Sequence, residues 1–512
     1  MSNTRIVLNT TILYAKMAIT TLISLYTVRL VLDSLGTIDY GIHNVIMGVV
    51  AMLAFFNAAL SVSTQRYLSY YQGQGESQKM IEIFNHSLFL HILFGLVVVI
   101  LLESIGTLVL NQILTIPIER LAAATVIYHF VSLSVFFTFV SVPFSAAINA
   151  NERMEWIAIV SVFESLGKFL IAIYLSYTSY DKLIVYGIGV GCITIVAFIL
   201  YFIVCYRFFA ECRHISFRKI KRKILYDFGK FVGWSIVGSV TALSKNHGIS
   251  ILFNIFNGPA VNAAYGVANQ VSAQLNYFSA TMIRSLNPQI MKSEGAGNHQ
   301  KMLFLSTQGC KYGFLLLSFF SIPFIFEMPS ILGIWLKQVP EYSVVFCDLV
   351  LVAMMFDQLT VGINSAFQAS NLVKQSAIYV GAVKLLILPL GFILLNRNYS
   401  VYYVIVIYAI VELVAGWVRL LLAKYYLNYS LRMYSSDVYI IVVIPVVCSI
   451  TACIVVQLFS HSIYRFIYTI VISMLTFSVF SYFYSLNQEE RKVVNHYLIK
   501  LKEKCFPFYE KS

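Results

Sequence analysis

Apolar runs long enough to cross a lipid bilayer recur along this chain from its first residues to about residue 485. A helix needs about 20 apolar residues to cross the hydrocarbon core, where every backbone polar group must be hydrogen-bonded within the protein. Apolar residues make up 59% of the 512 residues and charged residues only 12%, against about 25% charged in soluble domains. These features exclude a string of soluble domains and predict an all-α polytopic membrane protein.

Counting about 20 apolar residues per span predicts about fourteen transmembrane helices. The stretch 326–345, which contains Pro329, Trp335 and Pro340, is expected to be interfacial rather than spanning. No short apolar region with a cleavage site follows Arg5, so the first span is expected to remain as a helix. The expected spans are 7–31, 40–63, 83–110, 120–148, 155–178, 183–207, 229–256, 260–284, 303–326, 344–369, 374–395, 401–424, 436–458 and 463–485.

One pattern occurs twice in the chain. A Tyr-Gly-x-x-Asn sequence begins at Tyr40 and again at Tyr265, and each copy is followed by an apolar stretch and a Gly-x-Gly loop, at Gly73 and at Gly295. Tyr265 follows Tyr40 by 225 residues and Gly295 follows Gly73 by 222, a difference of less than one helical turn. The duplication predicts two similar membrane halves, which is typical of transporters whose site lies between the halves.

The longest basic run lies between the sixth and seventh expected spans and predicts a cytoplasmic linker near anionic head groups. Six helices precede this linker, so both halves should enter the membrane with the same orientation. The chain then divides into an N-terminal six-helix lobe at 1–208, the linker at 209–228, a C-terminal six-helix lobe at 229–425, two extra helices at 426–486 and a basic cytoplasmic tail at 487–512.

The net charge of +13 comes from basic residues in loops that alternate with the apolar spans. With the N-terminus placed in the cytoplasm, the cytoplasmic loops and tails hold most of the 36 lysines and arginines, as the positive-inside rule requires. We therefore expect both termini to be cytoplasmic. The positive charge is explained by membrane orientation, so nucleic acid is not an expected partner.

Five cations fall on helices that the repeat makes equivalent, and each is costly inside a bilayer. This placement predicts a water-filled cationic cavity between the halves that binds a phosphate-bearing head group. The alternatives are packing or pairing with a carboxylate for the lysines, and snorkelling to the interface for the arginines. The five are Lys16 and Arg29 on the first helix, Arg66 at the end of the second, Lys245 deep in the seventh and Arg284 at the end of the eighth.

Three carboxylates within spans are candidates for coupling transport to a proton or sodium ion: Glu164, Asp357 and Glu412. Lys168 follows Glu164 by four residues, so a neutralised pair is expected there. Glu412 and Arg419 are seven residues apart on one helical face, where they could also pair. Asp357 lies in the middle of its span, with Lys384 on the next expected helix.

The sequence contains no catalytic or nucleotide-binding signature. The Gly-x-Gly loops at 73–75 and 295–297 follow membrane helices and open no βαβ unit, and no GxxxxGK[ST] loop is present. The eight cysteines lie mostly in apolar runs, without CxxC or Cys/His metal spacing. We expect a protein that is not an enzyme and needs no cofactor or metal.

Several short segments carry a family likeness: Arg29 to Gly36 followed by Asp39-Tyr40-Gly41, Gln65-Arg66-Tyr67, and Asn149 to Arg153. Together with two six-helix halves and two extra helices, they resemble the polysaccharide-transport branch of the multidrug/oligosaccharidyl-lipid/polysaccharide (MOP) exporter superfamily. The likeness is greatest to bacterial O-antigen and capsule lipid-linked oligosaccharide flippases. It implies translocation of undecaprenyl-pyrophosphate-linked repeat units across the inner membrane for polysaccharide (including lipopolysaccharide) biosynthesis, by alternating access driven by an ion gradient. It also implies contacts with polysaccharide assembly proteins.

Three alternatives stay open at this point. A multidrug/ion antiporter of the same superfamily would bind cationic drugs and should carry more acid than base in its cavity. A membrane polysaccharide polymerase or glycosyltransferase, which would be an enzyme, should carry a large outer loop, and none of the expected outer loops is long enough to form a domain. A non-transporting scaffold of the assembly machinery is a third, weaker alternative.

Overall fold

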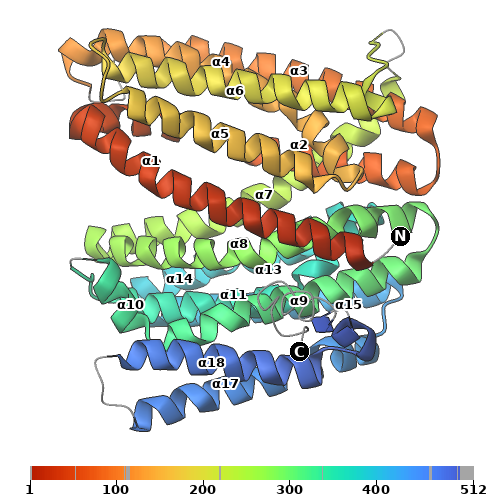
Figure 1. The fold of residues 1–512 in the computed structure, drawn as a ribbon. Helices are drawn as coiled ribbons and strands as arrows, with labels where there is room; N and C mark the ends of the chain where they lie inside the picture. Colours follow the sequence, from red (N-terminus) through yellow and green to blue (C-terminus); the bar gives the residue numbers. More distant parts are fainter. Residues whose placement is uncertain are drawn as a thin grey trace, which may run out of the picture. The chain divides into compact units, whose positions relative to one another are not determined.

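In the computed structural model the described residues form α-helices joined by short turns, and no β-strand occurs among them (Figure 1). The structure describes residues 3–51, 54–108, 110, 116–217, 221–336, 338–459, 464–492 and 494–495. The helices of the first part are α1 (Asn3–Ala51), α2 (Ala54–Gly73), α3 (Ser77–Leu108), α4 (Ile118–Ala150), α5 (Met154–Tyr174), α6 (Lys182–Phe208), α7 (Arg222–Asn257) and α8 (Pro259–Gly295). They are followed by α9 (His299–Phe326), α10 (Met328–Trp335), α11 (Ser343–Ala369), α12 (Val373–Gln375), α13 (Gly381–Leu385), α14 (Ile387–Asn396), α15 (Val401–Leu427), α16 (Leu431–Tyr434), α17 (Ile440–Phe459) and α18 (Arg465–Phe480).

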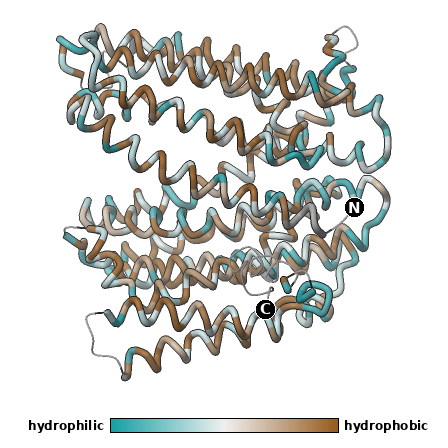
Figure 2. The backbone as a smooth tube through the Cα atoms, viewed as in Figure 1, coloured by the Kyte–Doolittle hydropathy of each residue, from teal (hydrophilic) through white to brown (hydrophobic). Residues whose placement is uncertain are grey.

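Eleven of the described helical segments are long and apolar enough to cross a membrane. Each of the fourteen expected spans coincides with helical residues, and the long helices outside the set of eleven are α2, α7 and α8. Those three helices line the cavities described below, which accounts for their more polar composition. Figure 2 shows apolar residues along the helices and hydrophilic residues gathered at helix ends and turns. The all-α polytopic membrane fold expected from the sequence is confirmed.

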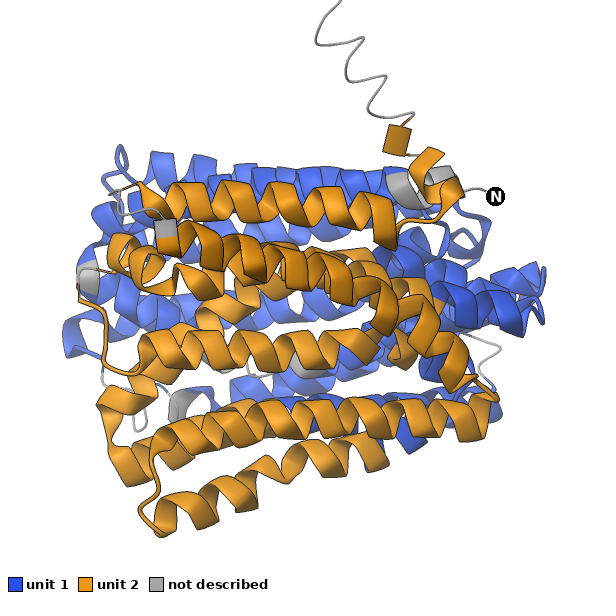
Figure 3. Ribbon diagram, turned by 90° about the horizontal axis from the view of Figure 1, so that it is seen from below, with its two compact units in different colours: residues 1–242, 284–305, 365–378 blue, residues 243–283, 306–364, 379–512 orange. Residues whose placement is uncertain are grey.

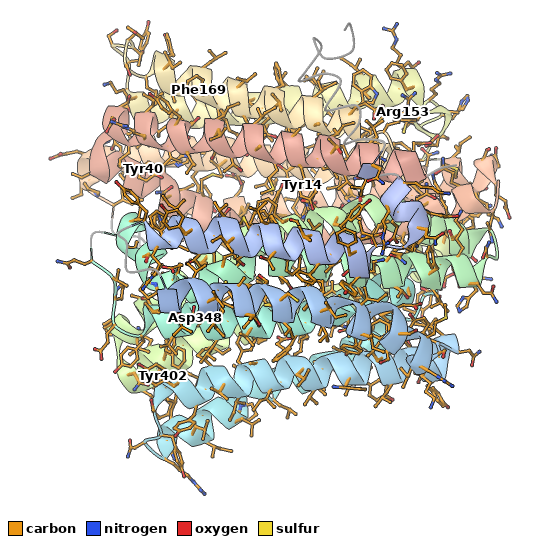
Figure 4. All side chains as sticks on the ribbon, turned by 60° about the horizontal axis from the view of Figure 1, so that its bottom comes forward. Tyr14, Tyr40, Arg153, Phe169, Asp348 and Tyr402 are labelled. Carbon is orange, nitrogen blue, oxygen red and sulfur yellow. The ribbon has the colours of Figure 1, made fainter. Side chains whose placement is uncertain are left out.

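The boundary between the first two expected spans, 7–31 and 40–63, coincides with a break in α1. At Gly36 the backbone is not helical, with φ of 74° and ψ of 174°, so α1 consists of two helical segments joined at a kink. Glycine adopts positive φ without steric cost, so the chain changes direction there while both flanking segments stay helical. In Figure 4, Tyr40, just beyond this kink, lies toward the left end of the unit 1 helices, and Arg153, in the turn between α4 and α5, lies toward their right end.

The chain divides into two compact units (Figure 3). Unit 1 comprises residues 1–242, 284–305 and 365–378, and unit 2 comprises residues 243–283, 306–364 and 379–512. Helices α7, α8, α9 and α11 therefore each contribute residues to both units. The division into two six-helix lobes on either side of a linker stays a prediction.

In unit 1, α4 is the central helix, and it packs against α2, α3 and α6. Small buried residues on its C-terminal half, Ala146, Ala147 and Ala150, allow close approach of neighbouring backbones, as is usual where helices pack in a membrane. Beside them the rings of Phe84 and Phe144 meet edge to face at 5.3 Å. The first helix, α1, packs mainly against α5.

In unit 2, buried charges on α9 and at its end bind α18 and the segment that follows it. Lys311 on α9 is 3% exposed and lies 2.9 Å from Glu490, which follows α18. Glu327, at the break between α9 and α10, is fully buried; Arg465 lies 3.2 Å from it, and Thr469 donates a hydrogen bond to it at 2.8 Å. Because an unpaired buried charge is costly, these contacts hold the N-terminal end of α18 and the segment that follows residue 485.

An arginine in unit 1 joins three helices. Arg120, in the first turn of α4, donates two hydrogen bonds to Asp39 on α1 and two to Asp181, at 2.6–3.0 Å. Asp181 also caps α6, since its carboxylate accepts from the backbone N–H groups of Leu183 and Ile184. Such forked arginine–carboxylate contacts combine charge with fixed geometry. The Asp39 of the family-like segment therefore holds α1 to α4 and α6.

The C-terminal ends of the two repeat copies approach each other closely in unit 1. A Cβ atom added to Gly73, at the end of α2, would overlap the carbonyl oxygen of Lys292, and one added to Gly295, at the end of α8, would overlap the carbonyl oxygen of Tyr70. Position 73 in the first copy corresponds to 295 in the second, and 70 corresponds to 292. The contact is therefore reciprocal: Gly73 lies against the backbone of α8 at Lys292, and Gly295 lies against the backbone of α2 at Tyr70. Both glycines are required because the neighbouring atoms belong to backbone.

The turn between α4 and α5 contacts both helices, α2 and α8, near this close approach. Glu152 is 4% exposed and has φ of 58°; its carboxylate accepts a hydrogen bond from Gln289 at 2.5 Å and pairs with Lys292, both on α8. Its neighbour Asn151 accepts from Gln72 on α2 and donates to Glu211. The family-like segment Asn149 to Arg153 thus connects the ends of both repeat copies.

The predicted linker is fixed to α3 wherever it is described. Asn85 binds the backbone of His214 and Ser216, and the Nε2 atom of His86 accepts a hydrogen bond from the backbone N–H of Lys221 at 2.7 Å. The ammonium of Lys221 also pairs with Glu82 at 2.8 Å. Attraction to lipid head groups alone, as expected from the sequence, therefore does not account for the position of this segment.

Replacing Gly73 or Gly295 by alanine should lower the free energy of unfolding by roughly 1–3 kcal/mol, the usual cost of overpacking. The added methyl group meets a backbone carbonyl that cannot rotate away. The measurement is the thermal unfolding midpoint of the full chain in detergent. Gly266→Ala on α8 is the control, because no atom lies within 4 Å of the added Cβ and alanine favours helix. Unchanged midpoints in the Gly73 and Gly295 variants would contradict the close crossing.

The hydrogen bonds of Arg120 to Asp39 and Asp181 should make the unfolding free energy depend on pH in the acid range. Hydrogen bonds from Arg120 lower the pKa of Asp181 below its usual value. A lowered folded-state pKa means that the stabilisation is complete above the unfolded pKa, about 4, and is lost as pH falls through the folded value. The unfolding midpoint should therefore fall on acidification, and less so in Asp181→Asn. The exposed Asp33→Asn should behave like the unaltered chain; an identical pH profile for all three proteins would remove Asp181 from the explanation.

Candidate functional site

A polar cavity of about 520 Å³ lies within unit 2. It is bordered by α7, α8, α11 and α15, and much of its lining consists of amides, hydroxyls and charged groups rather than the aliphatic side chains that dominate the spans. The polar residues are Lys245, Asn246, His247 and Ser250 on α7; Asn269, Ser272 and Asn276 on α8; Asp357 on α11; and Tyr408 and Glu412 on α15. A hydrophilic pocket of this kind, among helices that are otherwise apolar, marks a candidate binding site.

Charged residues form a continuous ion network at this cavity. Lys245 lies 2.5 Å from Glu412, and Lys384 lies 2.8 Å from the other oxygen of the same carboxylate. Lys384 also lies 2.9 Å from Asp357, which Arg419 approaches at 3.1 Å. The network contains three cations and two carboxylates, so its net formal charge is +1 although each cation has a carboxylate partner.

The positions of these residues on their helices determine which charges meet in the network. Tyr408, Glu412 and Arg419 lie on one face of α15, at spacings of four and seven residues. Lys384 lies on α13, which follows a π-helical turn at residues 376–380. A π-turn inserts one residue and rotates the side chains beyond it, and such turns are frequent at functional sites. Tyr408 adds a neutral partner, since its hydroxyl accepts from Lys245 at 3.1 Å.

Three of the sequence candidates, Lys245, Asp357 and Glu412, are brought together here. Lys245 pairs with a carboxylate, the alternative that the sequence left open for it. The possible pair of Glu412 and Arg419 does not form: Arg419 binds Asp357 and Thr360, and Glu412 pairs with the two lysines. The reason is that seven residues span about 10 Å along a helix, while α7 and α13 supply closer bases.

The other candidates belong to unit 1. Lys16 is partly buried on α1 and lies within electrostatic range of Arg284 and Glu164, without an ion pair among the described residues. Glu164 pairs with Lys168 at 2.7 Å, as expected. Arg29 is exposed on α1. Because these residues and Lys245 lie in different units, the meeting of all five cations in one cavity stays a prediction.

Arg66 is buried rather than snorkelling. It is 6% exposed, and its Nε and Nη2 atoms donate to the carbonyl oxygens of Gln368 and Ala369 at the C-terminal end of α11, at 3.2 and 3.1 Å. The guanidinium also lies over the rings of Tyr67 and Tyr70, at 4.5 and 4.9 Å from their centroids. A cation at a helix C-terminus satisfies carbonyls that have no partner within the helix.

Sequence reasoning missed several residues that the structure makes prominent. Lys384 was noted only as a neighbour of Asp357, yet it bridges both carboxylates. Asn269 was recognised as part of the repeat but not as cavity lining, and the repeat itself was the signal that could have identified it. Asp348 on α11, labelled in Figure 4, was not considered; its Oδ1 atom is buried without a hydrogen-bond partner among the described residues.

The fold and cavity define a polytopic helical membrane protein with a polar site among its spans, and comparison with known proteins refines this class. A family model described as MatE matches residues 13–178. No curated protein matches the chain at a significant level.

Solved structures of MATE transporters share the fold. A MATE structure in the straight conformation superimposes with a TM-score of 0.70 at 15% identity, over 83% of this chain and 96% of that one. A MOP superfamily transporter from Pyrococcus furiosus, described as having a binding pocket of reversed polarity that suggests a different function, gives 0.70 at 14% identity, over 83% and 95%. An outward-facing multidrug resistance MATE family transporter gives 0.65 at 15% identity, over 83% and 95%. The chain therefore has the fold of MATE transporters of the MOP superfamily.

Removing one member of the ion network should be far more damaging than removing a pair. Glu412→Leu leaves Lys245 and Lys384 short of a counter-charge, and we expect a loss of about 3–5 kcal/mol in unfolding free energy. The double variant Lys245→Met/Glu412→Leu should recover much of this loss, because it buries one fewer unpaired charge. Thermal or denaturant unfolding in detergent measures both.

The control is Glu76→Gln, which removes one partner of an exposed pair with Lys79 and should leave the unfolding midpoint nearly unchanged. Equal effects of Glu412→Leu and Glu76→Gln would show that the network does not contribute as a buried unit.

Proposed function

We propose that this chain is a member of the MOP exporter superfamily, a membrane transporter and not an enzyme, and that it translocates lipid-linked oligosaccharides. The shared fold, the MatE match over residues 13–178 and the apolar multi-pass architecture support transport. The substrate would be an undecaprenyl-pyrophosphate-linked repeat unit, moved from the cytoplasmic to the outer leaflet of a bacterial inner membrane. Both termini would be cytoplasmic, and proteins that assemble O-antigen or capsule would be partners.

The composition of the unit 2 cavity carries this proposal. Asn246, Asn269 and Asn276 offer both donors and acceptors, and Ser250, Ser272 and His247 add further polar groups. Sugar hydroxyls need such groups in place of water, whereas a drug with an apolar body needs apolar walls. The net positive charge of the ion network favours an anionic pyrophosphate over a cationic drug.

The ion network also suggests how transport is coupled. An anionic head group competes with Glu412 and Asp357 for Lys245, Lys384 and Arg419. A doubly charged anion exceeds the network's net charge of +1 by one negative charge, and protonation of one carboxylate restores neutrality. A sodium ion would face three positive side chains, so a proton is the better coupling ion here. Glu412, which holds two lysines, is the first candidate and Asp357 the second; Glu164 is already paired with a single lysine.

In unit 1, Lys16 and Arg284 remain proposed contacts for the head group, since neither has an ion-pair partner among the described residues. Arg29, exposed on α1, is a weaker candidate of the same kind. Arg66 is committed through two of its nitrogens to α11, so any role in binding must use its remaining nitrogen. Transport would proceed by alternating access, with the repeat halves moving relative to each other.

A multidrug/ion antiporter is the second candidate, favoured by the likeness to a multidrug resistance MATE family transporter. A cationic drug would require an unpaired carboxylate in the cavity. Asp357 and Glu412, the two acids that line it, each have two basic partners. This arrangement favours the flippase.

In proteoliposomes, the purified chain should translocate a fluorescent polyprenyl-pyrophosphate oligosaccharide, measured by protection from an external reagent. Asn269→Ala and Asn276→Ala should each reduce the rate at least about 5-fold, because each removes hydrogen bonds of about 1 kcal/mol to the sugar. An inward-directed pH gradient should alter the rate in the unaltered chain but not in Glu412→Gln.

Asn396→Ala, at the exposed end of α14, is the matched control and should keep the full rate. Transport of a cationic dye without transport of the lipid-linked oligosaccharide would overturn the flippase proposal in favour of the antiporter. A pH response that survives in Glu412→Gln would remove that residue from coupling while leaving the substrate unaffected.

A further inference from the structure

A second cavity, of about 540 Å³, lies within unit 1 and shares no lining residue with the first. It is formed by the C-terminal end of α2, the first turns of α7, the end of α8 and the turn between α11 and α12. Its lining combines three cations, two carboxylates and five aromatic rings: Arg66, Lys230 and Lys374; Asp227 and Glu294; Tyr67, Tyr70, Tyr71, Phe231 and Trp234.

Arg66 supplies a fixed positive charge to this cavity. Its Nε and Nη2 atoms are held by the carbonyls at the end of α11, and two tyrosine rings lie against the guanidinium. The third nitrogen, Nη1, donates to no carbonyl or carboxylate in the part of the chain that the structure describes. The backbone contacts fix the buried guanidinium in place and do not use Nη1. This nitrogen is therefore a preorganised donor for a phosphate oxygen.

Two lysines add positive charge that no carboxylate neutralises. Lys230 and Lys374 have no ion-pair partner within the described ranges, whereas Glu294 is engaged by Ser370 at 3.0 Å and by His299 at 2.9 Å. The ammonium of Lys374 instead lies 5.4 Å from the ring centroid of Trp234. The cavity therefore has cations available for an anionic ligand.

The remaining lining suits a sugar ring. Aromatic faces pack against the apolar C–H face of a pyranose, while polar groups at the edge bind its hydroxyls. Gln375 provides such a group: its Oε1 atom is buried without a hydrogen-bond partner in the described structure, which is unusual for a buried amide oxygen. The carboxylate of Asp227, which has no ion-pair partner among the described residues, is a second acceptor in the lining.

We propose that this cavity binds a phosphorylated sugar, with the phosphate at Arg66, Lys230 and Lys374 and the ring against Trp234. The choice of source rests on the proposed function: the ligand is the phosphate-linked first sugar of a lipid-linked oligosaccharide rather than a soluble sugar phosphate. The cavity is then a second substrate site, distinct in its residues from the polar cavity of unit 2.

Trp234 provides the measurement. In the full chain with Trp156→Phe, Trp335→Phe and Trp417→Phe, Trp234 is the only tryptophan. Glucose 1-phosphate should change its fluorescence saturably, and inorganic phosphate and glucose should each bind at least about 10-fold more weakly, because each offers half of the contacts. Glucose 1-phosphate carrying a short prenyl chain should bind more tightly than glucose 1-phosphate. Equal binding would keep the site and assign it to soluble sugar phosphates.

Lys230→Gln and Lys374→Gln should each raise the half-saturation concentration at least about 5-fold, and Lys424→Gln, on the last turn of α15, should leave it unchanged. The half-saturation concentration is compared rather than the amplitude, because Lys374 itself lies near the indole. Arg66 is left intact, since it also holds the end of α11. No saturable change, equal binding of inorganic phosphate, or insensitivity to both lysine variants would overturn the proposal. Flippase activity in proteoliposomes is measured separately. Transport without saturable binding would overturn only this site, and saturable binding without transport would overturn only the proposed function.

Discussion

The reciprocal crossing of α2 and α8 is the constraint on which unit 1 depends. Each helix end approaches the backbone of the other at a glycine, and a side chain at either position would overlap a carbonyl group. The close approach brings Gln289 and Lys292 to the buried carboxylate of Glu152, and the neighbouring Asn151 connects α2 to Glu211. Segments far apart in the chain, 1–242 and 284–305, therefore form one compact unit.

Charge neutralisation governs unit 2 in the same way. Inside an apolar bundle an isolated lysine or glutamate is costly, and it is tolerated when each charge has partners of opposite sign. Lys245, Lys384 and Arg419 surround Glu412 and Asp357 and leave one positive charge over. That excess, beside a cavity rich in amides and hydroxyls, is the physical basis for preferring an anionic, hydroxyl-bearing substrate to a cationic drug.

Much of the fold could be predicted because membrane insertion imposes strong local rules. The apolar runs identified the helices, and the duplicated Tyr-Gly-x-x-Asn and Gly-x-Gly segments identified the two copies. The break between the first two expected spans falls at Gly36, where a glycine with positive φ kinks α1. The candidate site could be predicted only in part: Lys245, Asp357 and Glu412 were singled out because charge is rare in spans. Their ion-pair partners could not be predicted, because no sequence pattern indicates which lysine and which carboxylate on different helices will pair.

By itself, the sequence determined that the chain is a polytopic helical bundle containing an internal duplication, since hydrophobic length and repeated segments are properties of the chain alone. Only the tertiary structure decided that Arg419 pairs with Asp357 rather than with Glu412 and that Arg66 binds carbonyl groups of α11. It also decided that Gly73 lies against the backbone of α8 and Gly295 against that of α2. The physical reason is that helix rotation and crossing set which side chains meet. Those quantities depend on packing between segments hundreds of residues apart, which no local pattern encodes.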